Sequence, residues 1–173
     1  MSAIPKNRKK LIFMIHKHQA THLHYDLRIE IAGTLKSWAL KELPSKNKPG
    51  VLAIQVPDHP FWYRHFEGVI PEGEYGAGPV MVWEKGLYTN LTIDAKRKKI
   101  PIEQCLEKGF LLLHLEGYKL NGTYALVRIS KKQRWIFTQL TNHSDSKKKS
   151  QPWNRSVKSN KTLGQIFNKK KLI

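Results

Sequence analysis

Apolar and polar residues alternate over short segments along most of the chain, and turn-forming residues stand between these segments. The segments are rich in β-branched and aromatic residues, which is typical of strands. They cover residues 11–17, 24–32, 35–41, 51–56, 79–85, 87–93, 110–117, 123–130 and 134–140. Many short strands with little helix predict an all-β fold with minor α content, either a compact β-barrel or a sandwich closed on itself.

Two local signals refine this prediction. Ala32-Gly33 predicts a hairpin turn between the second and third segments. Residues 102–108 are the one good helix candidate, and Gly109 is the residue expected to end that helix. Cys105, the single cysteine, falls in this candidate helix and is interpreted as a packed small residue. We therefore expect one or two short helices beside the strands.

Composition divides the chain into a basic N-terminal arm, a single domain and a stretch dominated by Ser, Lys, Asn and Gln, at residues 1–10, 11–143 and 144–173. The last stretch has the composition of a mobile tail, although Trp153 and residues 163–167 could dock locally. The apolar run 11–15 is too short for a secretion signal or a membrane span. A single cysteine allows no disulfide framework. We therefore expect a soluble, monomeric, cytoplasmic protein.

The charge is strongly positive, with 31 Lys and Arg against 13 Asp and Glu and a net charge of +18. Much of it lies on the N-terminal arm and on the stretch 144–173. A surface of this kind favours polyanions, of which nucleic acid is the common one. The basic ends are either solubilising extensions or salt-sensitive phosphate contacts, and we favour the second interpretation. It predicts association with the nucleoid.

Four of the eight histidines lie close together near the N-terminus, as His16, His18, His22 and His24. Because alternate residues of a strand share a face, the strand at 24–32 has a polar and an apolar side. The polar side carries His24, Asp26, Arg28 and Glu30, and the apolar side carries Tyr25, Leu27, Ile29 and Ile31. A short loop can fold His18 back beside His24. Nothing in the spacing requires His16 or His22 to join them.

Two imidazoles and a carboxylate that converge make a site for a borderline divalent cation, such as Mn²⁺ or Zn²⁺. Three protein ligands, here His18, His24 and Asp26, leave positions open for water and a phosphate oxygen, which is a catalytic rather than a structural arrangement. Arg28 would stand beside the cation as a phosphate-binding fork. The alternative is that these residues form the solvated face of an amphipathic strand.

A second group of polar residues follows within residues 56–78. His59, whose backbone is restrained by the following proline, is either a contact for the scissile phosphate or a satisfied loop histidine. Tyr63 either donates its hydroxyl to the phosphate or packs in the core. The glycine-rich residues 71–80 lack the lysine of a phosphate-binding loop and are interpreted as turns, so we reject a nucleotide-binding loop.

At these residues the sequence resembles a known family, the 3′-phosphoesterase module of bacterial and archaeal DNA ligase D, including its free-standing versions. The resemblance rests on residues 17–40, 57–86, 115–129 and 134–137. These segments keep the order and spacing of the family and cover most of residues 11–140.

The resemblance implies a compact β-barrel with its site in a crescent-shaped groove. It implies manganese, or another divalent metal such as Zn²⁺ or Co²⁺, bound through His18, His24 and Asp26. It also implies phosphate contact by Arg28 and His59, supported by Tyr63. The implied activity is removal of a 3′-terminal ribonucleotide at a primer–template, followed by removal of the remaining 3′-phosphate, which leaves a 3′-OH for DNA end joining.

The chain departs from the family pattern in three places. Glu42 stands where the family has a lysine, unless Lys41 takes that place after a one-residue slip, and we expect Lys41 to bind substrate. Val51 stands where the family has an arginine. The polar N-terminal flank of the family is mostly missing. Fewer cations weaken the grip on a dianionic terminal phosphate most, so we predict weaker phosphomonoesterase than phosphodiesterase activity.

Two other functions compete with this interpretation. The first is a non-catalytic nucleic-acid-binding module with a degenerate site, favoured by the altered lysine and arginine positions. The second is an iron oxygenase, because His24, Asp26 and a distal histidine such as His114 match a facial-triad pattern. No ligase or polymerase segment is recognised, so such domains, and end-binding repair proteins, are expected to be separate partners that meet the protein at DNA or DNA/RNA 3′ ends.

Overall fold

The computed structural model describes residues 10–130, 133–141 and 151–168. Within these residues the strands are β1 (Leu11–Gln19), β2 (Leu23–Ile31), β3 (Thr34–Leu40), β4 (Gly50–Pro60), β5 (Gly68–Ile70), β6 (Gly78–Asn90), β7 (Phe110–Gly117), β8 (Asn121–Arg128) and β9 (Arg134–Gln139). The helices are the 3₁₀ helix η1 (Phe61–His65) and the α-helices α1 (Ile102–Lys108) and α2 (Leu163–Asn168). None of these helices has the length and apolar content needed to cross a bilayer.

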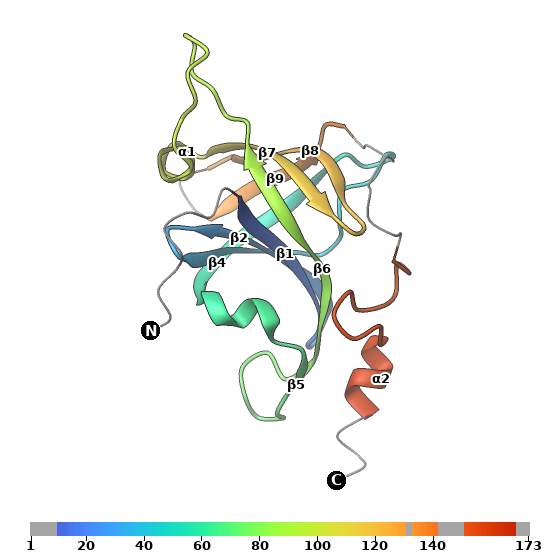
Figure 1. Ribbon diagram of the computed structural model, residues 1–173. Helices are drawn as coiled ribbons and strands as arrows, with labels where there is room; N and C mark the ends of the chain where they lie inside the picture. The colour runs from blue at the N-terminus through green and yellow to red at the C-terminus, as the bar shows by residue number, and fades with distance from the viewer. Residues whose placement is uncertain (1–9, 131–132, 142–150, 169–173) are drawn as a thin grey trace.

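The strands form one antiparallel sheet in the order β1-β2-β3-β4-β9-β8-β7-β6-β5. β1 also pairs with β6, which closes the sheet into an eight-stranded ring and leaves β5 outside it. The all-β fold with minor α content and the barrel expected from the sequence are therefore confirmed. Figure 1 shows β1 and β6 side by side where the ring closes.

The core fills the interior of this barrel. The apolar side of each strand faces this interior, and Ile15, Leu27 and Ile29 are completely buried there. Tryptophans from three strands meet there, and Trp38 packs edge-on against Trp135 with ring centroids 5.5 Å apart. The buried side chains of α1 belong to the same core. The residues of β1 and β2 that alternate with this apolar side consequently lie on the outer side of the wall.

Most sequence predictions of individual elements are confirmed. The helix α1 occupies the residues expected, and Gly109 ends it in the left-handed conformation with a φ of 78°. Ala32 and Gly33 both have positive φ, as a two-residue hairpin turn between β2 and β3 requires. The separate strands expected at 79–85 and 87–93 are one strand, β6, because Gly86 marks a close approach of β7 and not a turn.

Residues 151–168, here called the C-terminal strap, pack against β6 and end in α2 (Figure 1). Ile166 of α2 is buried, and the ring of Trp153 lies edge-on to Trp83 with centroids 4.7 Å apart. These are the two places where the sequence allowed local docking. The domain boundaries expected at residues 10 and 143 stay a prediction, because residues 1–9 and 142–150 lie outside the described part.

The close approach at Gly86 gives a test of the fold. A Cβ added at Gly86 would lie 2.1 Å from the carbonyl oxygen of Glu116 on β7, which is a backbone atom. We predict that Gly86→Ala lowers the free energy of unfolding by about 1–3 kcal/mol, the usual cost of overpacking. Gly164→Ala is the control, since its Cβ would meet only Thr162 at 3.9 Å. Equal urea denaturation midpoints for the two variants would contradict the prediction.

Candidate active site

The register of the β1–β2 hairpin brings the polar residues together. His18 lies opposite His24, and His16 lies opposite Asp26. Residues directly opposite in an antiparallel pair point to the same face of the sheet. Asp26 and Arg28 are only 8 % and 2 % exposed, so this face is covered. The alternative of a solvated amphipathic strand therefore does not hold.

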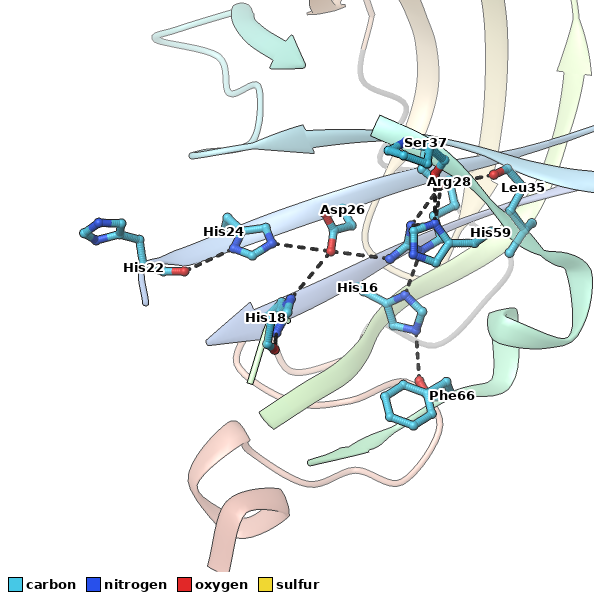
Figure 2. Close-up of polar contacts among 12 residues, drawn as sticks. His16, His18, His22, His24, Asp26, Arg28, Leu35, Ser37, His59 and Phe66 are labelled. Carbon is cyan, nitrogen blue, oxygen red and sulfur yellow. Dashed lines mark hydrogen bonds and ion pairs between the residues drawn. The ribbon is translucent and has the colours of Figure 1, made fainter. Parts of the chain in front are cut away.

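Asp26 lies at the centre of a cluster that could hold a metal ion. Its Oδ2 atom is 3.9 Å from Nδ1 of His18 and 3.5 Å from Nε2 of His24. The three ligand atoms that the cluster offers all lie within 4.8 Å of one another. Figure 2 shows Asp26 between the two imidazoles on one side and Arg28 on the other.

Backbone carbonyls fix which nitrogen of each imidazole carries the proton. Nε2 of His18 donates to the carbonyl oxygen of Gly76 at 2.6 Å, and Nδ1 of His24 donates to that of His22 at 3.1 Å. Since a carbonyl oxygen can only accept, the lone pairs of both rings are on the nitrogens that face Asp26. Histidine ligands of metals are oriented by the same kind of hydrogen bond. Two nitrogens and one carboxylate oxygen suit Mn²⁺ or Zn²⁺.

The charges in the cluster favour the deprotonated form that can bind a metal ion. Burial alone would raise the pKa of Asp26, but the hydrogen bond from His24 and the charge of Arg28 outweigh it and lower that pKa. His24 donates this hydrogen bond through Nε2 only when its ring is protonated, and the Asp26 carboxylate that accepts it raises the pKa of His24. Burial lowers the pKa of His18. Asp26 therefore stays ionised at neutral pH, and protons compete with a metal ion mainly at His24.

Arg28 is almost completely enclosed by polar partners. Its Nε donates to Nδ1 of His16 at 3.0 Å, and its Nη1 donates to Oγ of Ser37 at 2.8 Å and to Nδ1 of His59 at 3.0 Å. Its Nη2 lies 3.4 Å from the Asp26 carboxylate. These contacts use all but one of the N–H groups of a guanidinium. The sequence predicted an open fork, and the structure has an arginine held by four other residues.

The guanidinium in turn fixes two neutral histidines. Arg28 can only donate, so Nδ1 of His16 accepts from it and the proton of that ring is on Nε2. Nδ1 of His59 lies 3.0 Å from Nη1 of Arg28 and 3.2 Å from the carbonyl oxygen of Pro57; the closer, cationic donor decides, so this Nδ1 also accepts and its ring carries the proton on Nε2. The Nε2–H of His16 donates to the carbonyl oxygen of Phe66 at 2.9 Å. Burial, followed by the charge of Arg28, lowers the pKa of both rings, to about 3 for His16. His59 is the less enclosed of the two.

Tyr63 completes this part of the site. The centroid of its ring is 4.8 Å from that of His59 and 5.1 Å from the guanidinium carbon of Arg28. It also stacks on Phe66. Burial raises the pKa of Tyr63, so its phenol is a neutral donor at neutral pH. The expected residues from β1, β2, β4 and η1 thus gather in one place.

Two other residues that the sequence suggested, Lys41 and His114, lie apart from the cluster. Lys41, the exposed residue after β3, lines a separate surface pocket with Glu42, Lys46 and Lys119, and makes no hydrogen bond or ion pair with the cluster among the described residues. His114, the distal histidine of the oxygenase alternative, lies on β7, which pairs with β6 and β8 and with neither β1 nor β2. The crescent-shaped groove stays a prediction.

Sequence reasoning missed His16 and Ser37, which hold Arg28 from either side. The signal for Ser37 was the hairpin turn at Ala32-Gly33. A two-residue turn pairs Ile31 with Thr34, and counting back along both strands pairs Arg28 with Ser37. The signal for His16 was its place two residues before His18, on the same face of β1.

Comparison with known proteins gives consistent matches. Residues 16–128 match the family described as DNA Ligase D 3′-phosphoesterase domain. The multifunctional non-homologous end joining protein LigD of Pseudomonas aeruginosa is 45 % identical over 134 residues, which are 75 % of this chain and 15 % of that protein. The corresponding DNA repair protein of Mycobacterium tuberculosis is 40 % identical over 136 residues, 78 % of this chain and 17 % of that protein. The chain thus spans less than a fifth of these curated relatives.

The buried His16 gives a pH prediction for the metal-free protein. Between pH 6.5 and about 3 the unfolded chain takes up a proton at this residue that the folded chain does not. The free energy of unfolding should therefore fall as the pH falls through this range. His16→Gln should reduce the slope, as measured by urea denaturation at pH 7 and pH 5, whereas exposed His22→Gln should not. If the free energy of unfolding of His16→Gln depended on pH as steeply as that of the wild type, this assignment would be refuted.

Proposed function

The chain belongs to the DNA ligase D 3′-phosphoesterase domain family, and on that premise we propose that it is a divalent-metal-dependent phosphoesterase that processes nucleic-acid 3′ ends. The observation that carries the proposal is the cluster of His18, His24 and Asp26 beside an enclosed arginine. The substrate is a primer–template end. The protein removes a 3′-terminal ribonucleotide and then the 3′-phosphate, which prepares the end for joining during DNA repair.

In this proposal His18, His24 and Asp26 hold a manganese ion. The free lone pairs of the two rings and the ionised carboxylate make the donor set that such an ion needs, without any change of protonation at Asp26. When bound, a divalent ion supplies charge that polarises a phosphoryl oxygen. The side chain of His24 is 25 % exposed, so the cluster can be reached from solvent.

Arg28 contributes mainly its charge and its control of His59. Its N–H groups are largely engaged, so it cannot act as a bidentate phosphate fork without losing protein contacts. It keeps His59 neutral with the proton on Nε2, and this N–H is the group that donates to a phosphate oxygen. The phenol of Tyr63 is a second neutral donor beside it. Donors held in place before the substrate binds are what stabilises developing charge best.

The cations near the site are fewer than the family pattern has. Val51 belongs to the buried core, so an arginine at that position would bury a charge. The carboxylate of Glu42 pairs with Lys48. Lys41 is the remaining candidate for a contact with the substrate strand outside the cluster. This set is weaker for a dianionic terminal phosphate than for a monoanionic diester.

The names of the relatives place them in non-homologous end joining. We propose the same setting for this chain, as a monomer that meets separate ligase, polymerase and end-binding proteins at a DNA or DNA/RNA 3′ end. Its net charge of +18 supplies sequence-independent attraction to such ends.

The first test removes the central carboxylate. Asp26→Asn keeps the shape of the residue and removes the charge, so manganese binding and turnover should both be lost, with turnover falling by about a hundredfold or more. A labelled primer–template ending in one ribonucleotide, incubated with Mn²⁺, Zn²⁺, Co²⁺ or Mg²⁺, reports the product length and end group. Calorimetric titration with Mn²⁺ reports binding. Glu103→Gln, an equal change of charge on the exposed side of α1, is the control.

Two outcomes would reject the proposal. Normal turnover by Asp26→Asn would remove the cluster from the reaction. No turnover by the wild type with any of the metals, together with normal affinity for the primer–template, would instead support the non-catalytic binding module.

The second test concerns the two phosphate chemistries. On matched primer–templates, the wild type should cleave the diester faster than it removes a 3′-phosphate. Glu42→Lys should raise the phosphomonoesterase rate more than the diesterase rate, because the added cation meets two negative charges in one substrate and one in the other. Glu103→Lys makes the same change of charge elsewhere and should leave the ratio of the two rates unchanged. Comparable wild-type rates would contradict the prediction.

A further inference from the structure

The C-terminal strap lies along a stretch of the β6 edge that no strand covers among the described residues. β6 pairs with β5 at residues 78–80 and with β7 at residues 86–90. Between these ranges the N–H of Val157 donates to the carbonyl oxygen of Val82 at 3.0 Å, and the strap covers the gap (Figure 1). The strap also lies outside residues 16–128, the part of the chain that matches the family.

Ser156 is the point where the strap meets residues 65–67, which connect η1 to β5. It is 1 % exposed, and its Oγ accepts the N–H groups of Lys158 and Ser159, both at 3.0 Å. Its one hydroxyl proton therefore goes to the Glu67 carboxylate, at 2.5 Å. The same carboxylate oxygen accepts the N–H of Val82 at 2.8 Å. Glu67 is thus held between the strap and the barrel wall.

A second contact of the strap lies two residues before Glu67. Nζ of Lys158 donates to the carbonyl oxygen of His65 at 2.6 Å. The strap therefore holds the residues on both sides of Phe66. The carbonyl oxygen of Phe66 accepts the Nε2–H of His16, and His16 accepts from Arg28. A continuous path of hydrogen bonds and covalent backbone connects the strap to the guanidinium.

The segment that carries Phe66 is only partly buried. No side chain of η1 is buried, and β5 is three residues long with none of them buried. Segments with few buried contacts open locally at low cost in free energy. The contacts from Ser156 and Lys158 oppose such opening at the one carbonyl on which the orientation of His16 depends.

We propose that the C-terminal strap is a positioning element of the active site. Ser156 and Lys158 hold residues 65–67 so that the Phe66 carbonyl fixes the ring of His16, and through it the place of Arg28. Neither strap residue touches the substrate. The inference rests on the proposed function for its kinetic consequence, although the positional part stands without it.

The kinetic test uses the full chain and two strap variants. Ser156→Ala removes the hydroxyl, and Lys158→Met removes the ammonium while keeping the length of the side chain. In both, kcat on the ribonucleotide-ended primer–template should fall by about tenfold, the usual effect of losing an orienting partner. KM should change by less than about twofold, because the residues that contact substrate are intact.

Matched controls separate positioning from charge and from stability. Ser159→Ala removes a hydroxyl from the same turn of the strap, where its Oγ accepts the N–H of Lys161. Lys99→Met removes one charge far from the strap, and so reproduces any general loss of attraction to nucleic acid. Ile166→Val weakens the packing of α2, in which Ile166 is buried, and leaves both strap hydrogen bonds to residues 65–67 in place. All three should keep the kcat of the wild type. Glu67→Gln, which retains an acceptor, should keep more kcat than Glu67→Ala.

A spectroscopic test does not depend on turnover. The Nε2–H of His16 is buried and hydrogen-bonded, so it should give a slowly exchanging proton signal in ¹H–¹⁵N spectra of the metal-free protein. Ser156→Ala and Lys158→Met should broaden or remove this signal, and the three controls should retain it. Thermal melting curves show whether each variant is folded.

The outcomes are distinguishable. An intact signal and an unchanged kcat in both strap variants overturn the proposal, and so does a lost signal with unchanged kcat. An equal fall of kcat in Ile166→Val means that the strap acts only through stability, which also overturns it. An inactive wild type refutes the proposed function, while the proton signal still decides whether the strap positions His16.

Discussion

The guanidinium of Arg28 imposes the organisation of this site. A charge that is 2 % exposed must be compensated, or its burial would cost several kcal/mol. The compensation comes from side chains on four strands, since His16, Asp26, Ser37 and His59 belong to β1, β2, β3 and β4. Each partner accepts, so the requirements of one arginine determine the protonation of its neighbours. The arginine therefore acts as an internal template for the site.

The enclosure of Arg28 changes what this cationic group contributes to the site. An arginine that was expected to grip a phosphate directly instead sets up neutral donors, at His59 and beside it at Tyr63, close to an ionised carboxylate. Such an arrangement fixes these groups before any ligand binds, whereas a mobile arginine would have to reorganise. The polar residues are mounted on the strands of a closed barrel, which is the more rigid kind of support for a site.

Much of this could be predicted from the sequence, because a strand has a fixed period of two. Asp26 and Arg28 alternate with core residues, and this alone placed them with His24 on one face. The roles of His16 and Ser37 could not be derived from alternation, since they depend on strand register. The hydrogen bond between Glu67 and Ser156 was harder still to predict from the sequence. It joins residues 89 positions apart in the chain, across a turn whose composition resembles that of a free tail.

Closure of the ring has a consequence for how the site can work. His18, His24 and Asp26 stand on two strands that are hydrogen-bonded on both sides, so they separate only if the barrel itself comes apart. His59 at the end of β4, Tyr63 on η1 and the Phe66 carbonyl belong to the less buried segment that follows. The two halves of the site thus differ in the free energy that local opening costs. The outer half can open locally, while the inner half stays together as long as the barrel is folded.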